Sequence, residues 1–154
     1  MMKAGPDGSP TQPGHVHADL LSIELWVDGE KRISDPGVTS YNDDAARAWC
    51  RSSAAHNGPH FEGEDTSEVW SAFRTGRRAA ARIDFLHARP TRCRASRASL
   101  DGARVSRTVE LRDDGLDVFD DVERRDGQRL IVSNDLHGVS NDGFTVTAGG
   151  ARHA

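Results

Sequence analysis

The sequence predicts an all-β protein, an antiparallel β-sandwich with one short helix. Segments that alternate apolar and polar residues recur along the second half of the chain, Gly and Asp turns separate them, and a single stretch has the capping residues and composition of a helix. The 154 residues suffice for one hydrophobic core. We therefore expect one domain over 15–154, preceded by an irregular lead-in loop over 1–14 that is rich in Gly and Pro.

The first expected strand covers 15–27 and ends at the Asp28-Gly29 turn. Residues two apart share a face in an extended chain, so His15 and His17 should lie on the same face as the alternate apolar residues of 21–27. A buried strand would then carry two imidazoles at its upstream end.

Turn and cap residues predict the later elements. A return strand is expected over 31–35, before Pro36-Gly37 ends it. Asn42, Asp43 and Asp44 can cap a short helix over 45–49. Further strands are expected over 79–85, where Ala79, Ala81, Ile83 and Phe85 take the inward positions, and around 105–111, 116–118, 130–132 and 144–146.

The composition excludes several classes of function. The 20 basic residues are outnumbered by 24 acidic ones and are largely scattered, so we expect no nucleic-acid partner. No apolar run reaches the roughly 18 residues of a membrane span, and no signal-peptide stretch opens the chain. Cys50 and Cys93 lack metal-binding spacing.

Four side chains could carry chemistry: His15, His17, Asp35 and His56. Neutral imidazoles with a carboxylate suit zinc or a similar divalent ion, whereas a single histidine is more often a hydrogen-bonded structural residue. Direct pairing across the hairpin turn places Asp35 opposite Ser22, far along the strand from His17. A bend or bulge near residues 18–19 is therefore needed to bring them together.

Several sequence blocks occur in a fixed order: Ala4-Gly5-Pro6, 14–22, Asp35-Pro36-Gly37, 51–57 and 63–70. Together they resemble the C-terminal half of heparinase II/III family polysaccharide lyases over most of the chain. The resemblance implies a β-sandwich that follows an N-terminal α/α toroid, with cleavage of uronic-acid polysaccharides, heparin-like or alginate-like, by β-elimination in the cleft between them. It also implies a fragment of a longer lyase, periplasmic or secreted, that is inactive without the toroid.

The resemblance assigns roles to named residues. His15 would be a catalytic histidine facing the cleft, and His17, Asp35 and His56 would bind a structural metal ion, zinc by preference. Arg51 lies beside the third ligand and would meet a carboxylate or sulfate of an anionic polysaccharide, or else be a solvated arginine at a helix end.

Two other classes of function stay open. His17 and Asp19 form a His-x-Asp pair that, with His137, would match the ligands of a non-heme iron oxygenase. The chain would alternatively be a non-catalytic carbohydrate-binding module or a decayed fragment. Three tryptophans would stack on sugar rings in such a module, although the two that fall inside elements are expected in the core: Trp26, Trp49 and Trp70.

Overall fold

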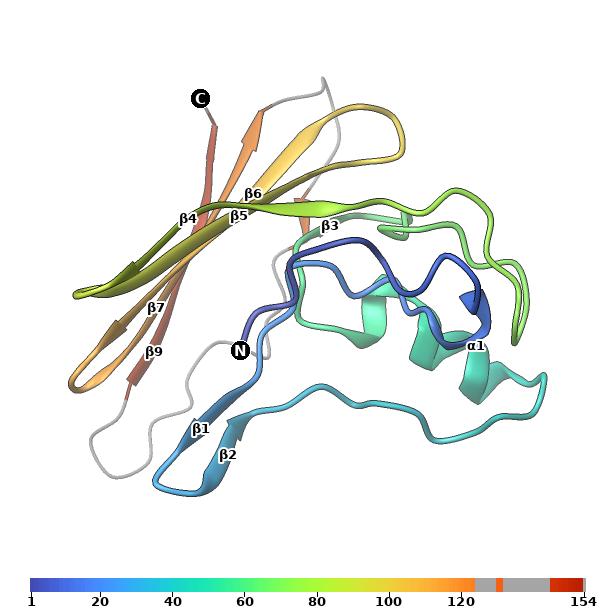
Figure 1. The fold of residues 1–154 in the computed structure, drawn as a ribbon, viewed down its shortest axis with the longest axis horizontal. Helices are drawn as coiled ribbons and strands as arrows, with labels where there is room; N and C mark the ends of the chain where they lie inside the picture. Colours follow the sequence, from blue (N-terminus) through green and yellow to red (C-terminus); the bar gives the residue numbers. More distant parts are fainter. Residues whose placement is uncertain (124–129, 132–144, 154) are drawn as a thin grey trace.

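The computed structural model describes residues 1–123, 130–131 and 145–153. Its main feature is a five-stranded sheet with the order β4-β5-β6-β7-β9 (Figure 1). Neighbouring strands pair antiparallel, except that β9 lies parallel to β7. The strands are β4 (Ala81–Ala88), β5 (Thr91–Ala98), β6 (Arg104–Arg112), β7 (Gly115–Glu123) and β9 (Thr145–His153).

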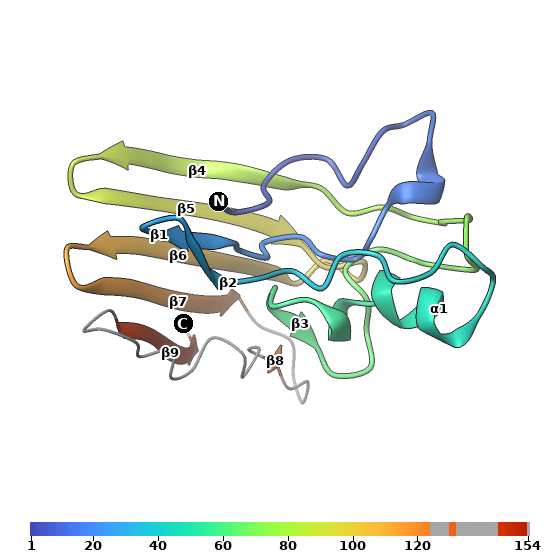
Figure 2. The same ribbon diagram turned by 90° about the horizontal axis from the view of Figure 1, so that it is seen from below.

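A thinner layer covers one face of this sheet. It contains the hairpin of β1 (Leu25–Val27) and β2 (Glu30–Ile33), with the irregular N-terminal segment beside it (Figures 1 and 2). A third, two-stranded sheet pairs β3 (His60–Phe61) with β8 (Leu130–Ile131). The expected all-β sandwich is confirmed, with the parallel β7–β9 pair as a departure from purely antiparallel pairing.

The α-helix of the described chain is α1 (Ala45–Arg51), as the sequence predicts. Asp44 caps it by accepting a hydrogen bond from the Arg47 amide at 2.8 Å, which satisfies one of the free N–H groups of the first turn. Two 3-10 turns, η1 (Pro13–His15) and η2 (Ser53–Ala55), precede and follow the helix in the chain. No helix in the described residues is long and apolar enough to cross a membrane.

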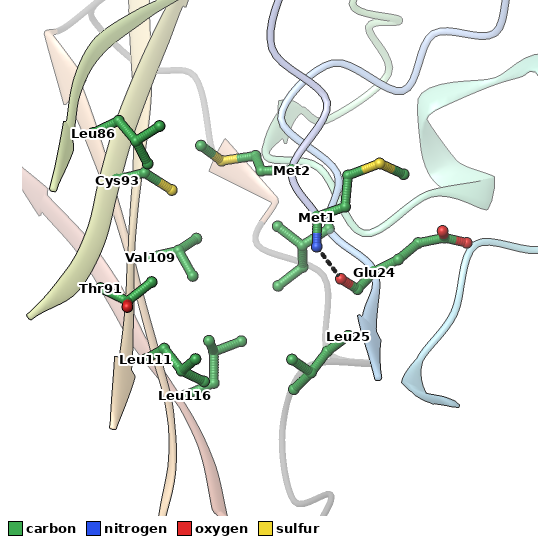
Figure 3. A pocket seen from close by; sticks show the side chains of 11 residues that line it. Met1, Met2, Glu24, Leu25, Leu86, Thr91, Cys93, Val109, Leu111 and Leu116 are labelled. Carbon is green, nitrogen blue, oxygen red and sulfur yellow. Dashed lines mark hydrogen bonds between the residues drawn. The ribbon is translucent and has the colours of Figure 1, made fainter. Parts of the chain in front are cut away.

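The core lies between the two layers and contains the buried ion pair of Arg107 and Asp120. Leu20 and Leu21 pack on apolar side chains of β4 to β7, and Ile23 and Ile33 pack on β7 and β9. Beside the hairpin the layers leave an apolar cavity of about 180 Å³ (Figure 3). Because its lining is almost entirely apolar, polar chemistry has to lie elsewhere.

The expected strand over 15–27 is wrong for most of its length. Pro13 starts a 3-10 turn that includes His15, and Leu21 adopts a left-handed φ of 66°, so the chain is extended in a ladder only from Leu25. His15 and His17 consequently do not share a face: His15 is exposed and His17 is buried. The bend or bulge that was expected near residues 18–19 is thus a longer irregular segment, and the β1–β2 pairing has a further register shift at residues 25–26.

Other packing expectations need correction too. Ile83 is 58% exposed on the edge strand β4 and is not a core residue, and a register shift between Ile83 and Phe85 changes the alternation of the residues after it. The tryptophans are exposed by 52–68%, so none of them is a core residue: Trp26, Trp49 and Trp70. The predicted strand residues 132 and 144 lie outside the described residues.

Candidate metal centre and its surroundings

The site lies at the end of the sandwich where the loops around α1 extend beyond the sheet (Figure 1). Two segments far apart in sequence, 16–18 and 51–53, are hydrogen-bonded to each other there. The Ala18 amide donates to the Arg51 carbonyl at 2.9 Å, and the Ser53 hydroxyl donates to the Ala18 carbonyl at 2.7 Å. These bonds bring His17 to the region of the chain that leads to His56.

Gly58 and Asn57 fix the other side of the site. A Cβ at Gly58 would lie 2.5 Å from the Leu20 carbonyl oxygen, so only glycine lets these two backbones approach so closely. The Asn57 side chain pairs with both backbone groups of Ile23, accepting from its amide at 2.8 Å and donating to its carbonyl at 2.9 Å. The segment that precedes β1 is thereby held against His56.

His56 and Asp35 form the centre of the site. Nδ1 of His56 lies 2.5 Å from Oδ2 of Asp35, and Nε2 lies 3.0 Å from the Cys50 carbonyl oxygen. Both neighbours are acceptors, so both contacts are hydrogen bonds only for a doubly protonated ring. Burial alone would raise the pKa of Asp35, but hydrogen bonds from His56 and the Gly37 amide lower it below its ordinary value.

His17 lies beside this pair, with its ring centroid 5.4 Å from that of His56. Burial, followed by the charges of His56 and Arg47, lowers the pKa of His17 to about 4. At neutral pH the ring is uncharged, as a metal ligand must be. The Nε2 atom of His17 lies 3.4 Å from a guanidinium nitrogen of Arg47. Because a guanidinium can only donate, the Nε2 atom accepts this hydrogen bond and its lone pair points toward Arg47.

Asp19 joins the cluster as a second carboxylate. One donor atom each from Asp19, Asp35 and His56 lie within 4.8 Å of one another, a spacing that can hold a metal ion. Burial raises the pKa of Asp19, against the opposing effect of its salt bridge with Lys3. The resemblance to lyases did not assign Asp19 a role. The sequence signal that could have placed Asp19 at this site was its position two residues after His17.

His15 and Arg51 occupy different surroundings. His15 ends η1 at the surface, with its ring in an edge contact to Tyr41 at 6.1 Å between centroids. Arg51 is fully buried and donates to the carbonyls of Pro13, Val16, Ser71 and Arg74. These bonds make Arg51 an anchor for the loops that carry the histidines, while its contact with a sugar stays a prediction.

Arg47 is the residue of this region that sequence reasoning missed. It is fully buried and donates to the carbonyls of Gly14 and Ala72, in addition to facing His17. Its spacing of four residues from Arg51 places both on one face of α1, which is a signal readable from the sequence.

The fold and the cluster define an all-β domain with a potential Asp-Asp-His metal site at one end of a sandwich. The chain matches the family model described as "Heparinase II/III-like, C-terminal" over residues 1–153, and it belongs to this family. It is therefore a polysaccharide lyase-related domain, and the resemblance seen in the sequence blocks is confirmed. Comparison with curated proteins and with solved structures finds no match.

Proposed function

We propose that this domain contributes to β-elimination cleavage of uronic-acid polysaccharides and holds a structural divalent metal ion, zinc by preference, through His17, Asp35 and His56. The observation that carries the proposal is the convergence of these side chains from three separate segments at one end of a family-matched sandwich. Bound there, the ion would cross-link the loops beside His15.

The donor chemistry suits such an ion, and in the described residues the donor atoms already within 4.8 Å of one another are those of Asp35 and His56 together with Asp19, not His17. Imidazole nitrogens and carboxylate oxygens are ordinary zinc ligands, and the His17 ring is neutral, as ligation requires. Ligation through Nε2 would exchange its long hydrogen bond with Arg47 for the metal. Ligation needs imidazole nitrogens and carboxylates without protons, so zinc binding should weaken in acid.

The chemistry assigned to His15 follows from its exposure. β-Elimination needs the uronate carboxylate neutralised, the C5 proton removed and the leaving C4 oxygen protonated. An exposed imidazole can take the first or the second of these tasks. The remaining groups would come from a toroid domain, with Arg51 near the sugar, and the whole enzyme would be periplasmic or secreted.

Metal analysis of the purified chain tests the site. Wild type loaded with zinc and dialysed should retain about one equivalent, whereas His17→Ala, Asp35→Asn and His56→Ala should each lower affinity by about tenfold or more. Asp19→Asn is the matched comparison, because Lys3 already neutralises that carboxylate and the loss should be smaller. Equal zinc content in wild type and His17→Ala would remove His17 from the ligand set.

The same variants address the iron oxygenase alternative, which the presence of Asp19 in the cluster favours. In that case Asp19→Asn abolishes iron binding and Asp35→Asn does not. The third ligand of such an iron site, His137, lies outside the described residues.

An ultraviolet assay for unsaturated uronates on heparin, chondroitin and alginate separates a lyase from a binding module, provided that the chain is mixed with a family toroid domain.

A further inference from the structure

Two buried arginines at this end of the sandwich, Arg47 and Arg51, form no salt bridge with a carboxylate of the described residues. Arg47 and Arg51 are each 0% exposed, and their guanidinium groups donate mainly to backbone carbonyls. Buried charges are normally paired, because carbonyl dipoles solvate a cation without cancelling its charge. Burial, with the neighbouring Arg47, also lowers the pKa of Arg51.

Two aromatic rings lie against this positive charge and remain open to solvent. The Arg47 Cζ atom lies 5.2 Å from the centroid of Tyr41 and 5.7 Å from that of Phe73, and these side chains are 57% and 50% exposed. Cation–π contacts of this kind hold a ring in place. Phe73 also packs on Gly14, where a Cβ would lie 3.3 Å from its ring. The two rings are therefore fixed beside the loop that carries His15.

A fixed, half-exposed aromatic surface above a buried arginine that has no salt bridge among the described residues suits one kind of ligand. A pyranose ring offers an apolar C–H face to an aromatic ring, and a carboxylate or sulfate on the same sugar is drawn to the positive charge below. We propose that Tyr41 and Phe73 form a stacking subsite for an acidic sugar residue beside His15. The class of ligand rests on the proposed function, whereas the location rests on the contacts of Arg47.

Titration of the full chain with defined sugars tests this subsite. The probes are hexasaccharides from alginate and from heparin, with cellohexaose as the neutral comparison, and the readout is the dissociation constant from calorimetry. Tyr41→Ala and Phe73→Ala should each weaken acidic-sugar binding about threefold to tenfold. Trp26→Ala is the comparison variant, because Trp26 is 59% exposed on the β1–β2 hairpin with the Lys31 amine 5.6 Å from its ring, and a loss of binding there would place sugar stacking on the hairpin instead.

The outcomes separate this inference from the proposed function. Weaker binding in both ring variants, restored by Tyr41→Phe and unaffected by Trp26→Ala, supports the subsite. Wild-type binding that both ring variants retain overturns the subsite alone, and so does equal affinity for cellohexaose. Failure of wild type to bind any acidic hexasaccharide overturns the subsite, whereas the proposed function is tested separately by zinc content and by the lyase assay with a toroid domain. Tyr41→Leu and Phe73→Leu replace the alanine variants if circular dichroism shows that the latter unfold, because leucine keeps apolar bulk against Arg47.

Discussion

The ion pair between Arg107 and Asp120 should dominate the stability of the interface between the sheet and the site loops. Both side chains are fully buried, and two guanidinium nitrogens each lie 2.8 Å from an Asp120 oxygen. A third nitrogen donates to the carbonyls of Leu21 at 3.0 Å and Asn57 at 2.6 Å. Arg107 on β6 therefore holds the segments next to Asp19 and His56.

Removing one partner leaves the other charge buried without compensation. We expect Arg107→Met to cost about 4 kcal/mol of unfolding free energy, because breaking a buried pair typically costs about 3–5 kcal/mol. The two released carbonyls add to this by about 1 kcal/mol each where no water replaces the donor. Such a loss is a large part of the roughly 5–15 kcal/mol that stabilises an ordinary domain.

Urea unfolding followed by circular dichroism measures this cost. The matched control is Arg112→Met on the same strand, since Arg112 is 38% exposed and its bridge to Asp117 should be worth less than about 1 kcal/mol. The double variant Arg107→Met/Asp120→Leu should recover part of the loss, because no unpaired charge remains. If Arg107→Met destabilises no more than Arg112→Met, the ion pair does not hold the two layers together.

Two further predictions concern the site. In metal-free protein, burial lowers the pKa of His17 to about 4, against an ordinary 6.5 in the unfolded chain, so stability should fall by about 3 kcal/mol as the pH drops between these values. Unfolding curves of His17→Gln should lack this component, and an unchanged pH profile would contradict the buried neutral ring. Gly58→Ala should destabilise the fold by about 2 kcal/mol and weaken zinc binding, because the added Cβ would press on the Leu20 carbonyl. A variant as stable as wild type in urea would show that the two backbones can separate at little cost.

Local signals in the sequence predicted the elements that depend on neighbouring residues. The Asp28-Gly29 turn does pair Val27 with Glu30, and Asp44 does cap α1. The pairing of Arg107 with Asp120 depends on the turn at Asp113-Asp114, because antiparallel pairing across that turn places residue 107 opposite residue 120. A charged side chain that points from a strand into the core is stable there only when an opposite charge such as Asp120 pairs with it.

The features that the sequence did not show depend on contacts between distant segments. Nothing within 15–24 signals that this apolar stretch avoids a ladder, since its irregular path depends on bonds to 51–53 and to Asn57. His17 and Asp35 each lie beside His56, but the donor atoms that group within 4.8 Å of one another in the described residues are those of Asp19, Asp35 and His56, so a ligand role for His17 stays a prediction. The bend expected near 18–19 is a wider irregular segment with a left-handed residue at Leu21.

The irregular path has a physical consequence for the position of His15. A strand would satisfy its carbonyls in a ladder, but the carbonyls of Pro13, Gly14 and Val16 instead accept from Arg47 and Arg51, both of which come from α1. The placement of His15 is therefore determined by a seven-residue helix rather than by the sheet. A helix this short has little stability of its own, so it depends on these same bonds. Helix and histidine loop should thus become ordered together, and a metal ion or acidic sugar bound beside them would stabilise both.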